Sequence, residues 1–175
     1  MQTQTITSAK TSVNTLPKVF VGPGNFEHGG INLDIGGGRF ETATEYLKGL
    51  GVRNLVWDPY NRSPEQNVRA LAEWGECVKQ AGIPRTITIS NVLNVIKEED
   101  ARLKVLEMAA NAVVDRWTPV YIGVYEGDRS GVGRATTKGY QLNRVKKDYL
   151  PEIKQFFKYA QVRAGIIVAS DSLGC

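Results

Sequence analysis

The chain has 175 residues, a length that suits one compact domain, since domains typically span about 100–200 residues. Hydrophobic residues make up 42% and charged residues 23% of the sequence, which is near the average for globular proteins and argues against wholesale disorder or a fibrous repeat. No apolar run approaches the roughly 20 residues that a transmembrane helix needs, so no membrane span is expected. The formal net charge of +4 permits an anionic partner.

Cysteine and histidine are scarce. Cys77 and Cys175 are the two cysteines and His28 is the single histidine, so neither a disulfide framework nor a zinc site is expected. His28 invites a general-base role, but the glycines that follow it favour a mobile loop instead. The first twenty residues lack the continuous apolar stretch of a secretory signal. We therefore expect a reduced, cytoplasmic protein without a metal site.

The chain begins with a polar segment and then enters a strand–turn–helix unit. Residues 1–25 are interrupted by prolines and glycines and predict an arm that leads into a single domain at 26–175. The segment Ile-Asn-Leu-Asp-Ile at 31–35 predicts a strand, which continues directly into three glycines at 36–38. Residues 40–50 then carry apolar side chains at helical spacing.

Strands and helices continue to alternate after this unit. A strand at 54–57 ends at Asp58, because the following proline favours a loop. Ser63 and Gln66 have the spacing of a capping box around Pro64, which predicts a helix from Pro64 to about residue 80. The other expected elements are a strand at 86–89, a helix at 98–114, a strand at 120–125, a glycine-rich basic loop at 126–147, a helix at about 150–159 and a strand at 164–169.

This alternation predicts an α/β fold with a doubly wound, mostly parallel sheet and helices on both faces. Ligands of such sheets bind at the carboxyl ends of the strands, where the strand order reverses. Residues that directly follow the strands are therefore the first candidates for a functional site.

The three glycines at 36–38 follow a strand and open a helix, where a ligand has to approach the backbone closely. Asp58 lies at the end of the next strand, about 20 residues further on, which suits a carboxylate that binds a ribose diol. The alternatives are a tight strand-to-helix turn without a ligand and an acid that stabilises a surface turn.

Charge distinguishes between nucleotide ligands at this turn. Glu41 stands where a dinucleotide motif has its third glycine, and Asp34 lies just before the turn. A pyrophosphate would meet these carboxylates unfavourably, whereas a cationic sulfonium would not. The sequence also lacks the G-K-[ST] of a P-loop. S-adenosylmethionine therefore suits the site better than NAD or ATP.

The pattern Asp34-x-Gly36-x-Gly38 with Asp58 resembles the class I S-adenosylmethionine-dependent methyltransferases, which have a Rossmann-like fold. The resemblance covers about residues 30–170, and the runs at 54–65, 90–96 and 124–131 are similar to a little-characterised bacterial and phage branch.

The resemblance implies roles for individual residues. Gly36 and Gly38 would pass beneath the methionine and ribose parts of the cofactor, Asp34 would help to hold its amino group, and Asp58 would bind the ribose hydroxyls. Tyr60 would stack near the adenine. The third strand whose terminal acid usually meets the adenine amine is not evident. The expected cofactor-binding residues are Asp34, Gly36, Gly37, Gly38, Asp58, Pro59, Tyr60, Ser90 and Asn91.

Polar residues that follow two later strands are candidates for chemistry. Ser90 and Asn91 would lie beside the transferred methyl group, with Asn91 orienting the acceptor; capping of the next turn is the alternative for Asn91 and Asn94. Glu126 would act on an acceptor proton, and Asp128 lies close to it; both also suit solvated turn acids. The expected catalytic residues are Asn91 and Glu126.

The segment from Arg134 to Arg163 has a local formal charge of about +6. Tyr140, Tyr149 and Tyr159 are interleaved with its cations, a combination that can bind the backbone and bases of a nucleic acid. The alternative is a solvated helix face with a loop.

These observations favour a methyltransferase that uses S-adenosylmethionine and acts on an unidentified acceptor, with nucleic acids and nucleotides among the candidates. Two alternatives remain. One is a non-catalytic module that binds S-adenosylmethionine or nucleic acid, and the other is an enzyme that cleaves S-adenosylmethionine. The oligomeric state is not predicted.

Overall fold

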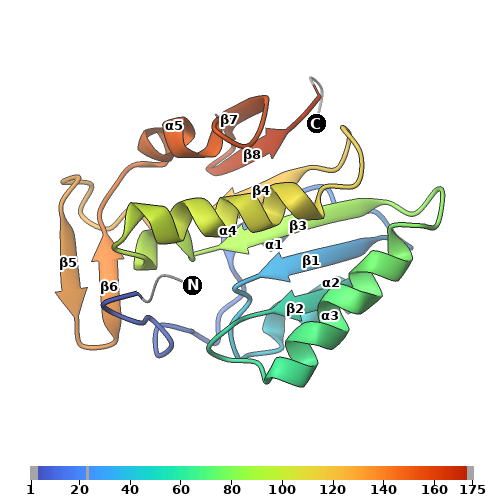
Figure 1. Ribbon diagram of the computed structural model, residues 1–175, viewed down its shortest axis with the longest axis horizontal. Helices are drawn as coiled ribbons and strands as arrows, with labels where there is room; N and C mark the ends of the chain where they lie inside the picture. The colour runs from blue at the N-terminus through green and yellow to red at the C-terminus, as the bar shows by residue number, and fades with distance from the viewer. Residues whose placement is uncertain (1–3, 23, 173–175) are drawn as a thin grey trace.

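The structure is a computed structural model that describes residues 4–22 and 24–172; Cys175 lies outside the described residues. A central sheet of six strands has the order β2-β1-β3-β4-β8-β7 (Figure 1). The prediction of a mostly parallel sheet is confirmed, because only β8 runs against its two neighbours. The strands are β1 (Ile31–Ile35), β2 (Arg53–Trp57), β3 (Arg85–Ser90), β4 (Val120–Gly123), β7 (Tyr159–Arg163) and β8 (Ile166–Ser170).

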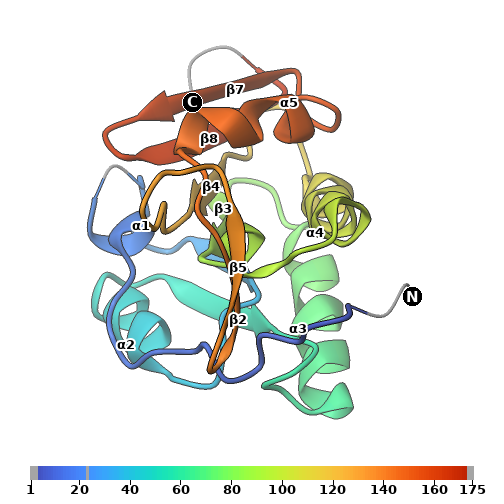
Figure 2. The same ribbon diagram turned by 90° about the vertical axis from the view of Figure 1, so that its left-hand side faces the viewer.

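Helices cover both faces of the sheet, as predicted (Figure 2). One face packs on α1 (Lys18–Val21) and α2 (Thr42–Gly49), and the other on α3 (Pro64–Cys77) and α4 (Glu99–Ala112). Each face has its own hydrophobic core, since the strands are buried on both sides. No helix in the described part of the chain is long and apolar enough to cross a bilayer.

The start of α3 has the geometry that its sequence predicts. The Ser63 hydroxyl accepts a hydrogen bond from Gln66 N, and the Gln66 side chain accepts one from Ser63 N. Pro64 occupies the first turn of α3. Backbone N–H groups in this turn have no partner within the helix, so proline, which lacks an N–H, costs no hydrogen bond there.

Two predictions for the last third of the chain are wrong. The helix expected at 150–159 is a single turn, α5 (Leu150–Ile153), and β7 already begins at Tyr159. The last strand begins at residue 166, because Ala164 and Gly165 form the turn of a β7–β8 hairpin. Both turn residues have positive φ angles, 45° and 86°, as a two-residue type I′ turn requires.

The segment expected as a loop at 126–147 contains a hairpin of β5 (Gly133–Thr136) and β6 (Gly139–Leu142). This hairpin stands beside the carboxyl ends of β1, β3 and β4 (Figure 1). Two 3-10 turns adjoin the hairpin: η1 (Leu93–Val95), after β3, contacts β6, and η2 (Lys146–Tyr149) follows β6 in the chain. The carboxyl edge of the sheet therefore has a side wall.

The N-terminal arm is packed onto the domain. Its first part crosses the carboxyl edge of the sheet from the α3 side to α2, and it ends in α1 (Figure 2). Val19 and Phe20 of α1 are buried against Tyr121 and Val168 of the sheet. The arm is thus positioned to take part in any site at this edge.

Candidate functional site

The strand order reverses between β1 and β3, since the chain proceeds from β1 to β2 on one side and then to β3 on the other. The glycine turn follows β1 at this point. Gly36 and Gly38 have φ angles of 75° and 76°, and a Cβ on Gly36 would meet the Val92 side chain after β3. The turn therefore requires glycine, both for its backbone conformation and for its approach to the neighbouring loop.

Asp34 is buried directly beneath this turn. It is 2% exposed, and its Oδ1 accepts a hydrogen bond of 2.8 Å from the Thr88 hydroxyl. A Cβ on Gly37 would collide with the Asp34 carboxylate. Burial raises the pKa of Asp34 to about 6, because the charged form loses its hydration.

A buried polar ladder across three strands holds the Thr88 hydroxyl in place. Asn32 Nδ2 donates to Thr88 Oγ1 at 2.9 Å and to Asn54 Oδ1 at 2.7 Å. Thr86 Oγ1 donates to Asn32 Oδ1 at 2.8 Å. Because Thr88 accepts from Asn32, its single proton is directed to Asp34, and the carboxylate is oriented toward the glycine turn.

Asp58 lies at the carboxyl end of β2, beside the same turn. Its Oδ2 accepts from Gly38 N at 2.9 Å, and its Oδ1 accepts from Tyr60 N and Asn61 N, each at 2.8 Å. The carboxylate therefore joins the glycine turn to the loop after β2. A carboxylate oxygen has two lone pairs, so Oδ2, with one bond in the structure, retains the capacity to accept another.

Arg62 is a site residue that the sequence analysis did not identify. Its Nε donates to Gly38 O at 2.9 Å, and its Nη1 pairs with Glu41. Its Nη2 is buried and has no hydrogen-bond partner among the described residues. The edge of the glycine turn therefore carries a buried N–H group that is free to donate a hydrogen bond to an oxygen or nitrogen atom of a ligand.

The loop after Asp58 presents an exposed face to this site. Pro59 and Tyr60 are both exposed, and 46% of Tyr60 is accessible to solvent. The sheet ends at β2 within the part of the chain that the structure describes. The strand that usually supplies the adenine-binding acid therefore has no counterpart beside β2 in this part of the chain, and the Tyr60 ring is available as a stacking surface.

The N-terminal arm covers the glycine turn. Ser12 Oγ accepts a hydrogen bond of 3.3 Å from Arg39 N and lies where a Cβ of Gly38 would project. Asn14 Oδ1 accepts from the Thr42 hydroxyl at the start of α2. Ser12 and Asn14 thus hold the arm over the turn by hydrogen bonds, so a ligand above the turn has to share this space with Ser12 or displace it.

A cavity of about 890 Å³ opens next to this turn, at the carboxyl ends of β3 and β4. We call it the acceptor cavity. The arm, the tip of the β5–β6 hairpin and the β7–β8 turn wall it. Its volume lies in the range of small-molecule sites. Its polar and glycine lining includes Lys18, Ser90, Asn91, Asn94, Gly123, Glu126, Arg129, Lys138, Gln141, Lys146 and Gly165.

The expected polar residues after β3 lie in the wall of the acceptor cavity. Ser90 Oγ is buried without a hydrogen-bond partner in the described chain. Asn91 has a φ of 55°, and its N–H donates to Gly123 O at 2.8 Å. Asn94 Nδ2 donates to Gln141 of the hairpin at 3.1 Å, so Asn94 connects η1 to the hairpin instead of capping a turn.

Glu126 also lies in this wall, but its carboxylate is already engaged. Its Oε1 accepts from Lys146 N at 2.8 Å and lies 3.2 Å from Lys146 Nζ, and its Oε2 lies 3.0 Å from Arg129 Nε. The bond from Lys146 N, with the two cations, lowers the pKa of Glu126. A carboxylate with a lowered pKa is a weak proton acceptor, so this geometry favours anchoring of the loop after β4.

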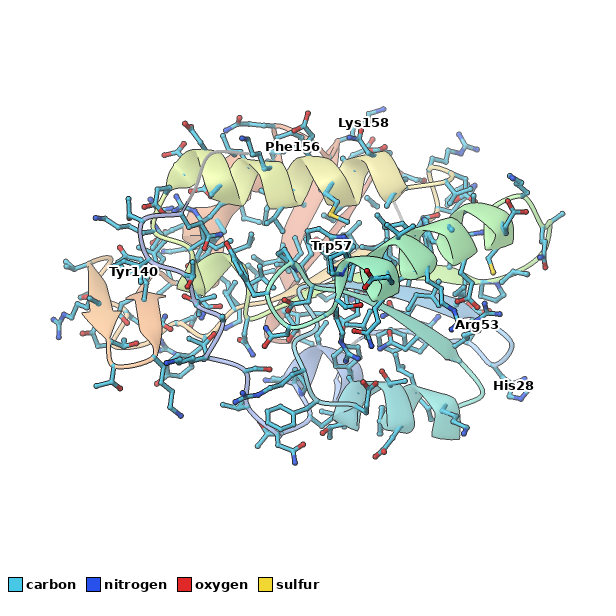
Figure 3. All side chains as sticks on the ribbon, turned by 60° about the horizontal axis from the view of Figure 1, so that its bottom comes forward. His28, Arg53, Trp57, Tyr140, Phe156 and Lys158 are labelled. Carbon is cyan, nitrogen blue, oxygen red and sulfur yellow. The ribbon has the colours of Figure 1, made fainter. Side chains whose placement is uncertain are left out.

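Asp128 and His28 lie in places with other roles. Asp128 accepts from Ser130 N at 2.9 Å and pairs with Arg134 at 3.3 Å, which stabilises the loop before β5. His28 packs against Gly51, just before β2. Figure 3 shows it at the opposite end of the molecule from Tyr140 of β6, so it is remote from the glycine turn and the acceptor cavity.

The basic segment 134–163 is less available than its sequence suggests. Arg144 pairs with the buried Glu152 at 2.6 Å, and Lys146 pairs with Glu126. Tyr140 and Tyr149 are buried in the hydrophobic core, which leaves them little surface for stacking of a base, whereas Tyr159 is half-buried. No group of His, Cys, Asp and Glu in the described ranges has the arrangement of a metal site.

No model of a protein family matches the sequence, and no curated protein does either. Among solved structures, the chain is similar to a SAM-dependent methyltransferase from Aquifex aeolicus, with a TM-score of 0.50, 14% identity and 85% of each chain covered. The sugar N-methyltransferase KedS8 from Streptoalloteichus sp ATCC 53650 aligns with a TM-score of 0.47 and 10% identity, over 81% of this chain and 80% of that one. The similarity to the Aquifex aeolicus protein shows that the chain has a methyltransferase-like Rossmann fold.

Proposed function

We propose that this chain binds S-adenosylmethionine at the glycine turn after β1 and transfers its methyl group to an acceptor in the acceptor cavity. One observation carries the proposal: the turn lies where the strand order reverses and is flanked by two buried carboxylates, Asp34 and Asp58. When bound, S-adenosylmethionine supplies an electrophilic methyl group on a positively charged sulfur.

The residues at the turn fit this cofactor. Gly36 and Gly38 leave backbone without side chains where the cofactor would pass. Asp58 Oδ2 has a lone pair for a ribose hydroxyl, and Arg62 Nη2 has an unsatisfied N–H for a cofactor oxygen or nitrogen. The negative charge of Asp34 and Asp58 favours a cationic ligand over a pyrophosphate.

Ser90 and Asn91 connect the two parts of the proposed site. Ser90 ends β3 and Asn91 follows it, and the neighbours of β3 in the sheet are β1 with the glycine turn and β4 with the far wall of the cavity. Methyl transfer depends mainly on alignment of the acceptor with the sulfonium, so hydroxyl and amide groups that orient an acceptor suffice. Under this proposal Glu126 positions the loop and does not need to remove a proton.

Asn91 provides a test that separates backbone strain from the role of its amide. A side chain at φ 55° costs about 1 kcal/mol unless the residue is glycine or asparagine. We expect Asn91→Gly to retain the free energy of unfolding in urea and Asn91→Val to lose about 1–2 kcal/mol. Asn91→Gly should nevertheless weaken S-adenosylmethionine binding about tenfold in calorimetry, roughly one hydrogen bond. Unchanged affinity would leave the amide with a structural role only.

Asp58 tests the cofactor site itself. Asn in its place keeps one oxygen for the N–H groups of Tyr60 and Asn61, but it turns an NH2 group toward Gly38 N and the ribose position. We expect Asp58→Asn to weaken S-adenosylmethionine binding by at least tenfold in calorimetry, since a hydrogen bond to a charged acceptor contributes about 1.5–3 kcal/mol. The matched control is Asp100→Asn, which changes an exposed acid in the first turn of α4.

Two other candidates remain, a non-catalytic binding module and an enzyme that cleaves S-adenosylmethionine. The ion pairs of Glu126 favour them, because a free general base is not evident in the cavity wall. Incubation of the chain with S-adenosylmethionine alone, followed by product analysis, separates cleavage from transfer. Absence of binding to both S-adenosylmethionine and its demethylated product would refute the proposal and both of these S-adenosylmethionine-based candidates.

A further inference from the structure

Basic side chains surround the acceptor cavity from three directions. Lys18 comes from α1, Lys138 from the tip of the β5–β6 hairpin, and Arg129 and Lys146 from the segments that flank this hairpin. Glu126 is the one acidic residue in the lining. The cavity therefore has a positive potential, although its elements are far apart in the sequence.

The four cations divide into an engaged pair and a pair with no acidic partner. Glu126 binds both Arg129 and Lys146. Lys18 and Lys138 form no ion pair with any residue that the structure describes. The Lys18 ammonium lies against Gly165, 2.7 Å from where a Cβ would project, so it is directed along the cavity wall formed by the β7–β8 turn.

The Ser90 hydroxyl provides a neutral donor in the same cavity. It is buried and has no partner in the described residues, and Gly123 opposite it leaves space that a side chain would fill. An anion can accept from this hydroxyl while the two ammonium groups balance its charge. Such a set suits a phosphate or carboxylate group.

The size and setting of the site favour a small molecule over a nucleic acid. The unpaired cations lie at a cavity of about 890 Å³, the size of a small-molecule site, whereas a nucleic-acid backbone needs an extended basic groove. Of the two aromatic residues in the lining, Tyr140 is buried in the core and Tyr125 is exposed, so the cavity offers one exposed ring and not the series of rings on which successive bases stack.

We propose that the acceptor cavity binds a small molecule that carries a phosphate or carboxylate group, held by Lys18 and Lys138. That this molecule is the methyl acceptor rests on the proposed function, whereas its binding does not. The ammonium groups would also keep an acidic acceptor oxygen deprotonated. Such an acceptor needs no free general base, which agrees with the engagement of Glu126 in ion pairs.

Inorganic pyrophosphate is the probe for a direct test by amide NMR at low ionic strength. We expect saturable shifts of the Gly123, Gly139 and Gly165 amides, which lie in or beside the cavity. The variant Lys18→Gln/Lys138→Gln should weaken this binding at least tenfold. The control variant Lys154→Gln/Lys158→Gln, which removes two exposed lysines outside the cavity, should leave it unchanged.

Each outcome decides one of the two proposals. Pyrophosphate binding without S-adenosylmethionine binding supports the anion site and refutes the proposed function, and the reverse result refutes the anion site alone. Shifts that do not saturate, or that are equally weak in both lysine variants, overturn the anion site. Lys138→Gln alone, at an exposed hairpin tip, keeps the test valid if the Lys18 substitution disturbs α1.

A nucleic-acid ligand would give a different result. If a single-stranded oligonucleotide binds more tightly than pyrophosphate, and the Lys154 and Lys158 substitutions weaken its binding, the proposal is overturned in favour of a nucleic acid.

Discussion

Asp34→Asn should make the protein more stable at pH 8 while weakening its binding of S-adenosylmethionine. Burial raises the pKa of Asp34 to about 6, from 3.8 in an unfolded chain. A difference of about two pKa units corresponds to about 3 kcal/mol of unfavourable free energy when the group is charged. Asn has nearly the same shape, still accepts from the Thr88 hydroxyl, and carries no charge to desolvate.

The pH dependence of this effect follows from the raised pKa. Between pH 3.8 and about 6 the native state keeps a proton on Asp34 that the unfolded chain has lost, so Asp34 makes the free energy of unfolding fall as pH rises through this window. Asparagine does not titrate. The gain from Asp34→Asn should therefore be about half as large at pH 5 as at pH 8, where it approaches 3 kcal/mol.

Urea denaturation at pH 5 and pH 8, together with calorimetric titration of S-adenosylmethionine, measures both effects. Asp148→Asn, which changes an exposed acid in η2, is the control and should alter neither quantity. Equal stability of Asp34→Asn and wild type at both pH values would show that Asp34 is not destabilising. Undiminished cofactor affinity would remove Asp34 from the proposed site.

A buried acid that destabilises the fold at neutral pH is typical of a functional position, because nothing in packing requires it. The ladder of Asn32, Thr86 and Thr88 surrounds Asp34 with neutral polar groups. These groups orient the carboxylate without neutralising it. The negative charge is thus retained directly under the glycine turn, where the proposed sulfonium ligand would benefit from it.

The glycine turn and the first strands were predictable because their signals are local. Gly36 to Gly38 directly follow the strand-forming segment at 31–35, and the Ser63–Gln66 capping box lies within four residues of sequence. Asp58 was predictable from its spacing to the turn. In the structure its carboxylate indeed binds Gly38 N, although the sequence does not reveal that three backbone N–H groups share it.

The hairpin and the edge strand were missed because their sequences lack the usual strand pattern. β5 reads Gly-Arg-Ala-Thr and is mostly exposed, and β7 is a polar edge strand with one buried residue, Ala160. Pro151 suits the start of a helix and gave no sign that α5 would end after one turn. Pairing with β8 decides the conformation of β7, and pairing between distant segments leaves little trace in local composition.

The site residues that the sequence did not identify all depend on long-range contacts. Ser12 meets Gly38 although 25 residues lie between them in the chain, and Lys18 reaches the cavity through the packing of α1 on β4 and β8. Thr88 is significant only because β3 pairs with β1. Such residues look ordinary in a polar or strand-forming context until the topology brings them together.

The walls of the acceptor cavity depend on a buried ion cluster, and its removal should have the largest effect on stability. Arg102 of α4 and Arg144, just after β6, both bind Glu152 of α5, at 2.8 Å and 2.6 Å. Burial raises the pKa of Glu152, but the hydrogen bonds and charges of the two arginines outweigh this effect and lower it overall. The cluster therefore connects the segment that follows β6 to α4 and α5 and so holds the β5–β6 hairpin against the domain.

Glu152→Ala should destabilise the protein by about 3–5 kcal/mol at pH 7, because it leaves the 3%-exposed Arg102 charged without its ion-pair partner. The wild-type contribution is present above pH 4.5 and is lost as pH falls through the lowered pKa of Glu152, so the two proteins should converge in urea denaturation in strong acid. Glu107→Ala, on the exposed side of α4, is the control. The variant Arg102→Met/Glu152→Leu should recover much of the loss, since an apolar pair leaves no buried charge. If Glu152→Ala cost less than 1 kcal/mol, water would have to reach Arg102, and the hairpin would need another anchor.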